Sequence, residues 1–147
     1  MSKKYLMALI PVVILALNLP LPGVARKGEP DVVVVQHILI GFKKTVPNKV
    51  IERTKKEAQA LALELLERAQ AGEDFDALIK EHTDDSYPGF YKLTNDDAPL
   101  MSEARSRDQM VPNFGHVAFR LEVGEVGLAK YHPGNSPFGW HIIKRIK

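Results

Sequence analysis

The amino-acid sequence predicts a single α+β domain, a small sheet with helices packed on it, behind an N-terminal export leader. A buried strand at 32–40, helical periodicity from 48 to 82 and two strand patterns at 126–131 and 139–146 support this prediction. A strand followed by helices and then by closing strands is typical of the α+β class.

The composition suits one compact domain and excludes several kinds of site. The chain has 147 residues, of which 45% are apolar and 26% charged, and it contains no cysteine. It therefore has no disulfide, no thiolate metal site and no cysteine nucleophile. The formal net charge is only +2, and Lys3 and Lys4 of the leader account for this excess. Nucleic acid is not expected as a partner, because phosphate binding requires clustered Lys and Arg.

Residues 1–25 are predicted to be a cleaved signal peptide. Two lysines precede an apolar run at 6–17, prolines then break the helix, and Gly23-Val24-Ala25 provides the small residues that signal peptidase accepts. An uncleaved anchor at 6–24 is the alternative, but a membrane span needs about 20 apolar residues, and prolines and an asparagine interrupt this stretch. We therefore expect an exported chain, periplasmic or secreted, with membrane anchoring as the second possibility.

The domain itself is expected at 32–147, after a polar linker at 26–31. Its first strand, at 32–40, is rich in β-branched residues. Because side chains alternate along a strand, His37 shares one face with valines and a leucine. This imidazole is therefore expected to project from the sheet among aliphatic side chains.

Two helices are predicted to follow the first strand. Asn48 is the expected N-cap of the long one, whose apolar residues recur at spacings of three and four until Gly72 ends it. Asp74 is the expected cap of a shorter helix at 75–82, and a turn-rich segment comes after that helix.

The second half of the chain gives weaker signals. From 90 to 109 no clear periodicity is present, and the composition is that of loops. Pro112 suits the first turn of a helix at about 111–119. In the last strand, period two places His141 beside Ile143 on one face.

Common catalytic and metal-binding motifs are missing from the sequence. None of the five histidines has the spacing of an HExxH zinc site, no serine lies in a GxSxG turn, and the glycines are too scattered for a phosphate-binding loop. We therefore expect no metal and no cofactor. The candidates that remain are the two strand histidines, the acidic turn at 84–85 and the apolar string at 110–114.

The two histidines and the apolar string belong to a set of six short blocks that resemble the parvulin-type peptidyl-prolyl cis-trans isomerases, in the order that this family has. The blocks are Gln-His-Ile-Leu-Ile at 36–40, Arg-Thr-Lys-Lys-Glu-Ala at 53–58, Ala-Gly-Glu-Asp-Phe at 71–75, Met-Val-Pro-Asn-Phe at 110–114, Ala-Phe-Arg-Leu-Glu-Val-Gly-Glu-Val at 118–126 and Gly-Trp-His-Ile-Ile-Lys at 139–144. The resemblance implies a four-stranded, mostly antiparallel sheet with one long helix and two or three short ones.

The resemblance also implies a catalytic set. His37 and His141 match the two family histidines that lie together under the active-site floor, and Asp85 matches the position where the family has Asp or Cys. Asp84 is the neighbouring residue and is the alternative match for this position. We expect the histidines to tune and support the site rather than to act as general bases, because rotation about a bond transfers no proton.

The substrate-binding set follows from the same resemblance. Met110 and Phe114 match the pocket that holds the substrate proline ring, and Phe119 is expected to close its far wall. The family's Gly-Gly-Asp-Leu-Gly block is reduced here to Pro-Gly-Phe-Tyr at 88–91. The pocket leucine that this block supplies is therefore unassigned, with Leu93 as the provisional choice.

Without the resemblance, these residues would have ordinary interpretations. A histidine among strand aliphatics is more often a satisfied core residue, and Met110 and Phe114 at helical spacing would be core. With the resemblance, the expected function is isomerisation of X-Pro bonds in unfolded or partly folded proline-containing polypeptides by a monomer. The alternative is a catalytically weak peptide-binding chaperone domain with the same fold.

Overall fold

The computed structural model describes residues 28–147, so the predicted signal peptide and the start of the linker lie outside the described residues. Its elements are β1 (Val32–Ile40), α1 (Lys55–Gln70), α2 (Phe75–His82), β2 (Phe90–Thr94), β3 (Arg105–Ser106), the 3-10 turn η1 (Arg107–Gln109), α3 (Pro112–Ala118), β4 (Val126–Ala129) and β5 (Trp140–Arg145). The α+β prediction is confirmed, and none of these helices is long and apolar enough to cross a membrane.

The strands form one sheet in the order β3-β2-β1-β5-β4. All neighbours are antiparallel except β2 and β3, which run parallel. The expectation of four strands was therefore wrong by one. The extra strand, β3, has only two residues, and it pairs with β2 through Arg105 and Leu93, which a loop separates in the sequence. So short a strand has no periodicity from which it could be predicted.

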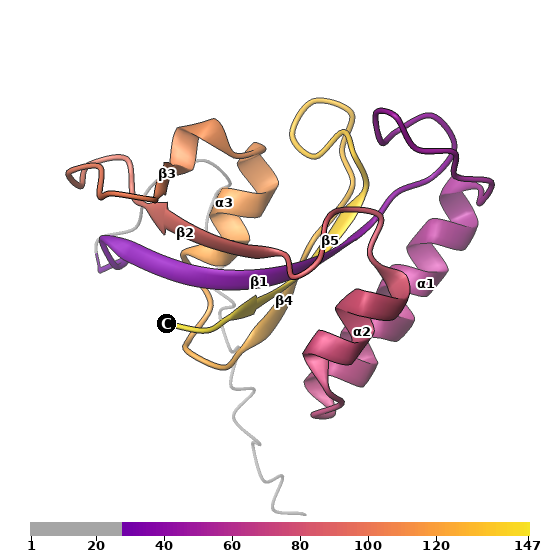
Figure 1. Cartoon of the computed structure of the whole chain (residues 1–147), viewed down its shortest axis with the longest axis horizontal. Helices are drawn as coiled ribbons and strands as arrows, with labels where there is room; N and C mark the ends of the chain where they lie inside the picture. Colours follow the sequence, from indigo (N-terminus) through magenta and orange to yellow (C-terminus); the bar gives the residue numbers. More distant parts are fainter. Residues whose placement is uncertain (1–27) are drawn as a thin grey trace, which may run out of the picture.

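Helices cover both faces of the sheet (Figure 1). On one face, Ile38 and Ile40 of β1 pack in a core cluster with residues of α1 and α2. On the other, Val33 and Val35 pack with Phe114 of α3. The alternation predicted for β1 is thus confirmed, and His37 lies on the α3 face, buried except for 2% of its surface.

The N-cap predicted from the sequence is correct for α2 and incorrect for α1. Asp74 caps α2 as predicted, because its side chain accepts hydrogen bonds from the first backbone N–H groups of that helix. For α1 the N-cap is Thr54, in a capping box with Glu57, and not Asn48. Asn48 instead has a φ of 60° in the loop before the helix, a backbone conformation that asparagine tolerates.

The described part of the predicted linker is packed against the domain. Glu29, 4% exposed at its side chain, forms an ion pair with Arg107, which is itself 7% exposed. Asn95 donates from its side chain to the carbonyl of Pro30 and from its backbone to that of Asp31. Residues 29–31 therefore pack against the sheet domain directly before β1 begins at Val32.

Candidate functional site

A groove of about 450 Å³ opens on the α3 side of the sheet. Its floor contains His37 of β1 and His141 of β5. One wall comes from the loop between β1 and α1, and the other from β3, η1 and the start of α3. Residues from segments that are far apart in the sequence therefore meet at this groove.

The two histidines are in contact under the groove. Their Nδ1 atoms lie 3.3 Å apart, and the ring planes are inclined by only 21°. The sheet produces this contact, because His141 pairs with Leu39, two residues along β1 from His37, and such diagonal neighbours on one face are within reach of large side chains. Burial of His141 lowers the pKa of its imidazole well below the usual value.

Asp85 completes a polar line with the histidines. Its Oδ2 atom lies 3.1 Å from Nε2 of His37 and accepts a longer hydrogen bond, 3.4 Å, from the hydroxyl of Tyr91. The hydrogen bond with His37 is the main reason that the pKa of Asp85 falls to about 2. The carboxylate is therefore ionised at neutral pH and acts as a hydrogen-bond acceptor.

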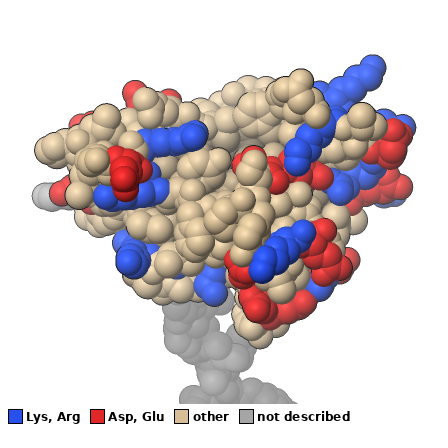
Figure 2. Space-filling model, viewed as in Figure 1, with Lys and Arg blue, Asp and Glu red and all other residues tan. Residues whose placement is uncertain are grey.

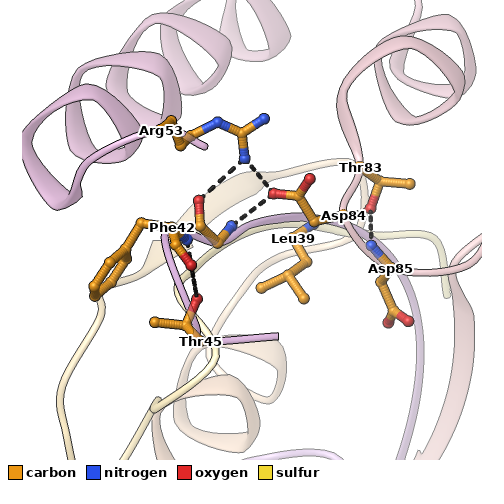
Figure 3. A network of polar contacts seen from close by, with 8 residues as sticks. Leu39, Phe42, Thr45, Arg53, Thr83, Asp84 and Asp85 are labelled. Carbon is orange, nitrogen blue, oxygen red and sulfur yellow. Dashed lines mark hydrogen bonds and ion pairs between the residues drawn. The ribbon is translucent and has the colours of Figure 1, made fainter. Parts of the chain in front are cut away.

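Asp84, the competing carboxylate, faces a different network (Figure 3). It accepts a hydrogen bond of 2.8 Å from the backbone N–H of Gly41 and forms an ion pair with Arg53, which also donates to the carbonyl of Gly41. Thr83 accepts from the backbone N–H groups of Leu39 and Asp85. These bonds fasten the acidic turn to the end of β1, so Asp85 is the carboxylate left to face His37.

Aromatic and aliphatic side chains surround the histidines. The ring of Phe114 stands edge-on to both imidazoles, with centroids 5.2 Å from His37 and 5.3 Å from His141. Met110 lines the groove and is partly exposed. The structure thus brings together five of the six residues selected from the sequence.

The sixth residue, Phe119, does not line the groove. It is 2% exposed, packs in the core and lies beneath the guanidinium of Arg107, 4.9 Å from ring centroid to Cζ. It follows Phe114 by five residues, which is about 140° around a helix, so the two side chains point in different directions. In this structure Phe119 therefore contributes to the core and not to a wall of the groove.

Tyr91 and Phe138 line the groove and were not selected from the sequence. Leu93, the provisional pocket leucine, is fully buried in the core, and Tyr91, two residues before it on the same face of β2, reaches the groove instead. Tyr91 lay in a segment without periodicity. Phe138 could have been found, since it directly precedes the Gly-Trp-His block.

Comparison with known proteins gives a family match. Residues 37–147 match the rotamase family described as the PPIC-type PPIASE domain. The chain is 36% identical over 123 residues to chaperone SurA of Chromohalobacter salexigens, covering 81% of this chain and 24% of that protein. It is 34% identical over 110 residues to foldase protein PrsA 4 of Bacillus cereus, covering 75% of this chain and 30% of that one.

A solved structure is similar as well. Peptidyl-prolyl isomerase ESS1 from Candida albicans superposes with a TM-score of 0.55 at 26% identity, over 80% of this chain and 63% of that one. The chain spans less than a third of the length of the two bacterial relatives. The likeness therefore concerns one domain of larger proteins.

Proposed function

The chain belongs to the PPIC-type peptidyl-prolyl isomerase domain family, and from this premise we propose that it catalyses cis-trans rotation of X-Pro bonds in unfolded or partly folded polypeptides. One observation carries the proposal. The apolar side chains of Met110 and Phe114 line the same groove as the polar chain that Asp85, His37 and His141 form through their side-chain contacts.

The reaction suits such a groove because it needs neither a nucleophile nor a metal. Rotation about the X-Pro bond must overcome roughly 18–20 kcal/mol, since amide resonance is lost in the twisted state. A site that binds the twisted amide more tightly than either planar isomer lowers this barrier. The twisted amide has less charge separation than the planar one, so apolar surroundings favour it.

We assign the residues to two roles. Met110 and Phe114 hold the pyrrolidine ring of the client and keep water from it. His37, His141 and Asp85 form a hydrogen-bonded floor that fixes the position of each ring and the local field where the client carbonyl turns. No proton transfer to the client is required, so the histidines act as positioning residues.

We further propose that the enzyme is exported and works as a monomer without metal or cofactor. The predicted signal peptide at 1–25 supports export. One of the two bacterial relatives is named a chaperone and the other a foldase, which supports clients that are still folding. Within residues 28–147, no cluster of His, Asp and Glu has the arrangement of a metal site.

The alternative is a peptide-binding chaperone domain with little turnover. Two observations favour it: the family's Gly-Gly-Asp-Leu-Gly block is shortened, and Tyr91 stands at the groove where an aliphatic side chain was expected. A binder of this kind would suppress aggregation of an unfolded client but would leave isomerisation at its uncatalysed rate.

An isomerase assay on a proline-containing tetrapeptide tests the proposal. We expect the wild type to accelerate isomerisation, and Met110→Ala to lower kcat/KM roughly ten-fold, because a lost methionine contact costs about 1.5 kcal/mol. Met101→Ala is the matched control, since Met101 is 46% exposed and does not line the groove. Wild-type protein that prevents aggregation without accelerating isomerisation would establish the alternative.

A further inference from the structure

We propose that Arg105 determines substrate specificity in the groove by binding the carboxylate of an acidic client residue next to the proline. This inference rests on the proposed isomerase function, because it assumes that a client proline occupies the groove. It concerns a cation on the groove wall that the rotation mechanism does not use.

Arg105 is held close to the reacting groups by Tyr91. It lies on the edge strand β3, and its guanidinium carbon stands 5.1 Å from the centroid of the Tyr91 ring. The same ring has its centroid 5.2 Å from that of His37 and 5.8 Å from that of Phe114. A single aromatic ring therefore separates the guanidinium from the floor and the apolar wall of the site.

The charge of Arg105 is not neutralised within the described chain. Arg53 and Arg107 each form an ion pair with a carboxylate, and several basic side chains border acidic ones on the face shown in Figure 2. Arg105 forms no ion pair with any residue of 28–147, although it is exposed at the groove. Stacking of a guanidinium on a ring leaves its N–H edges free for a two-pronged bond to a carboxylate.

The acidic residues of the groove do not oppose this role strongly. Asp84 is paired with Arg53 and points to the end of β1. Asp85 is bound by His37 and by the hydroxyl of Tyr91, and no ion pair joins it to Arg105. Asp85 is therefore the one carboxylate among the described groove residues that has no Lys or Arg partner, and its charge repels an acidic client residue. For this reason we expect the preference for acidic residues to be modest.

Lys49 is the competing assignment. It lines the opposite wall and forms no ion pair among the described residues either. Its flexible ammonium group has no aromatic support, whereas the guanidinium of Arg105 is oriented by Tyr91. A supported cation loses less freedom when it binds a carboxylate, and for this reason we assign the preference to Arg105.

The test compares tetrapeptides that differ only by Glu or Gln, placed directly before the proline in one pair and directly after it in the other. Exchange NMR measures kcat/KM for the wild type, Arg105→Gln, Lys49→Gln and Lys56→Gln. The last variant is the control for net charge, because Lys56 is exposed on α1 and does not line the groove. Each protein is measured at low and high NaCl.

We expect the wild type to favour Glu over Gln about two- to five-fold in at least one pair, the size of one exposed ion pair. The preference should disappear in Arg105→Gln, persist in Lys49→Gln and Lys56→Gln, and weaken at high salt. Equal rates for Glu and Gln in both pairs, or a preference that only Lys49→Gln removes, would overturn the assignment. If the wild type fails to accelerate even the Gln peptides, the proposed isomerase function itself is refuted.

Discussion

The Nδ1 atoms of His37 and His141 lie 3.3 Å apart, and a hydrogen bond between them requires a proton on one of the two atoms. Asp85 is ionised at neutral pH, so the Nε2 atom of His37 must donate to it. A neutral His37 then has a lone pair on Nδ1, and His141 must donate from its own Nδ1. The Nε2 atom of His141 is left as a buried acceptor without a partner in the described structure.

The first prediction concerns these tautomers. Replacing Asp85 with Asn supplies an amide N–H that can donate to Nε2 of His37, which moves the His37 proton to Nδ1 and the His141 proton to Nε2. We therefore expect nitrogen-15 NMR to show that each of the two rings has one tautomer in the wild type and the other tautomer in Asp85→Asn. Tyr91→Phe removes the other donor to Asp85 and should leave both tautomers as they are. Unchanged ring nitrogen shifts in Asp85→Asn would refute the proton order.

Glu29 is predicted to stabilise the domain through Arg107. Without the carboxylate, the guanidinium of Arg107 is a buried charge with no countercharge, so Glu29→Gln should lose about 3 kcal/mol of unfolding free energy at pH 7. Urea unfolding measures this value. Glu67→Gln, on the exposed side of α1, is the control and should change stability by less than about 0.5 kcal/mol.

The same pair has a defined pH dependence. Burial raises the pKa of Glu29, but the hydrogen bond and charge of Arg107, together with smaller contributions from Asn95 and Arg120, outweigh it, so the pKa lies below its usual 4.5. A lowered carboxyl pKa contributes stability that is complete above pH 4.5 and is lost as the pH falls through the folded-state value. The stability gap between wild type and Glu29→Gln should therefore narrow below this pH. A gap that is constant down to pH 3 would contradict the ion pair.

Asp84 is predicted to hold the loop wall of the groove. Its bonds to Gly41 and Arg53 connect both ends of the loop between β1 and α1. Asp84→Asn should lower the unfolding free energy by about 1–3 kcal/mol and raise KM more than it lowers kcat, because the wall is displaced while the floor stays. Asp97→Asn, exposed and outside the groove, should do neither. An effect confined to kcat would instead place Asp84 in the reaction.

Local signals in the sequence were enough for several elements. The bounds of α2 were predicted correctly, because Asp74 caps it and its apolar residues repeat at helical spacing. The faces of β1 followed from period two alone. For the site, six short blocks in family order selected His37 and His141, which are 104 residues apart in the chain and in contact in the structure.

The remaining features depend on contacts between distant segments. The strand β3 exists only because Arg105 and Ser106 pair with the end of β2. Tyr91 was missed because its neighbours in the groove come from β1 and α3, whereas the local sequence resembles a loop. Glu29 has no local pattern either, since its partner Arg107 is 78 residues away.

Gly139 gives the last prediction, which concerns how β5 starts. Its φ is +145°, and a Cβ atom there would lie 2.1 Å from the carbonyl oxygen of Ile40. That oxygen belongs to the backbone of β1 and cannot move without disturbing the pairing of Ile40 with Trp140. Gly139→Ala should therefore separate the start of β5 from β1 and displace His141, two residues further on, from His37.

We expect Gly139→Ala to lose more than about 3 kcal/mol of unfolding free energy, because backbone strain and overpacking act at the same position. Gly134→Ala is the matched control in the same loop: its φ is not in the left-handed region, and the nearest atom to its Cβ would be 3.7 Å away. Gly139→Ala should therefore have a lower thermal unfolding temperature and a lower isomerase activity than Gly134→Ala. If Gly139→Ala is as stable and active as Gly134→Ala, the close approach of the 139 backbone to β1 is not what holds His141 beside His37.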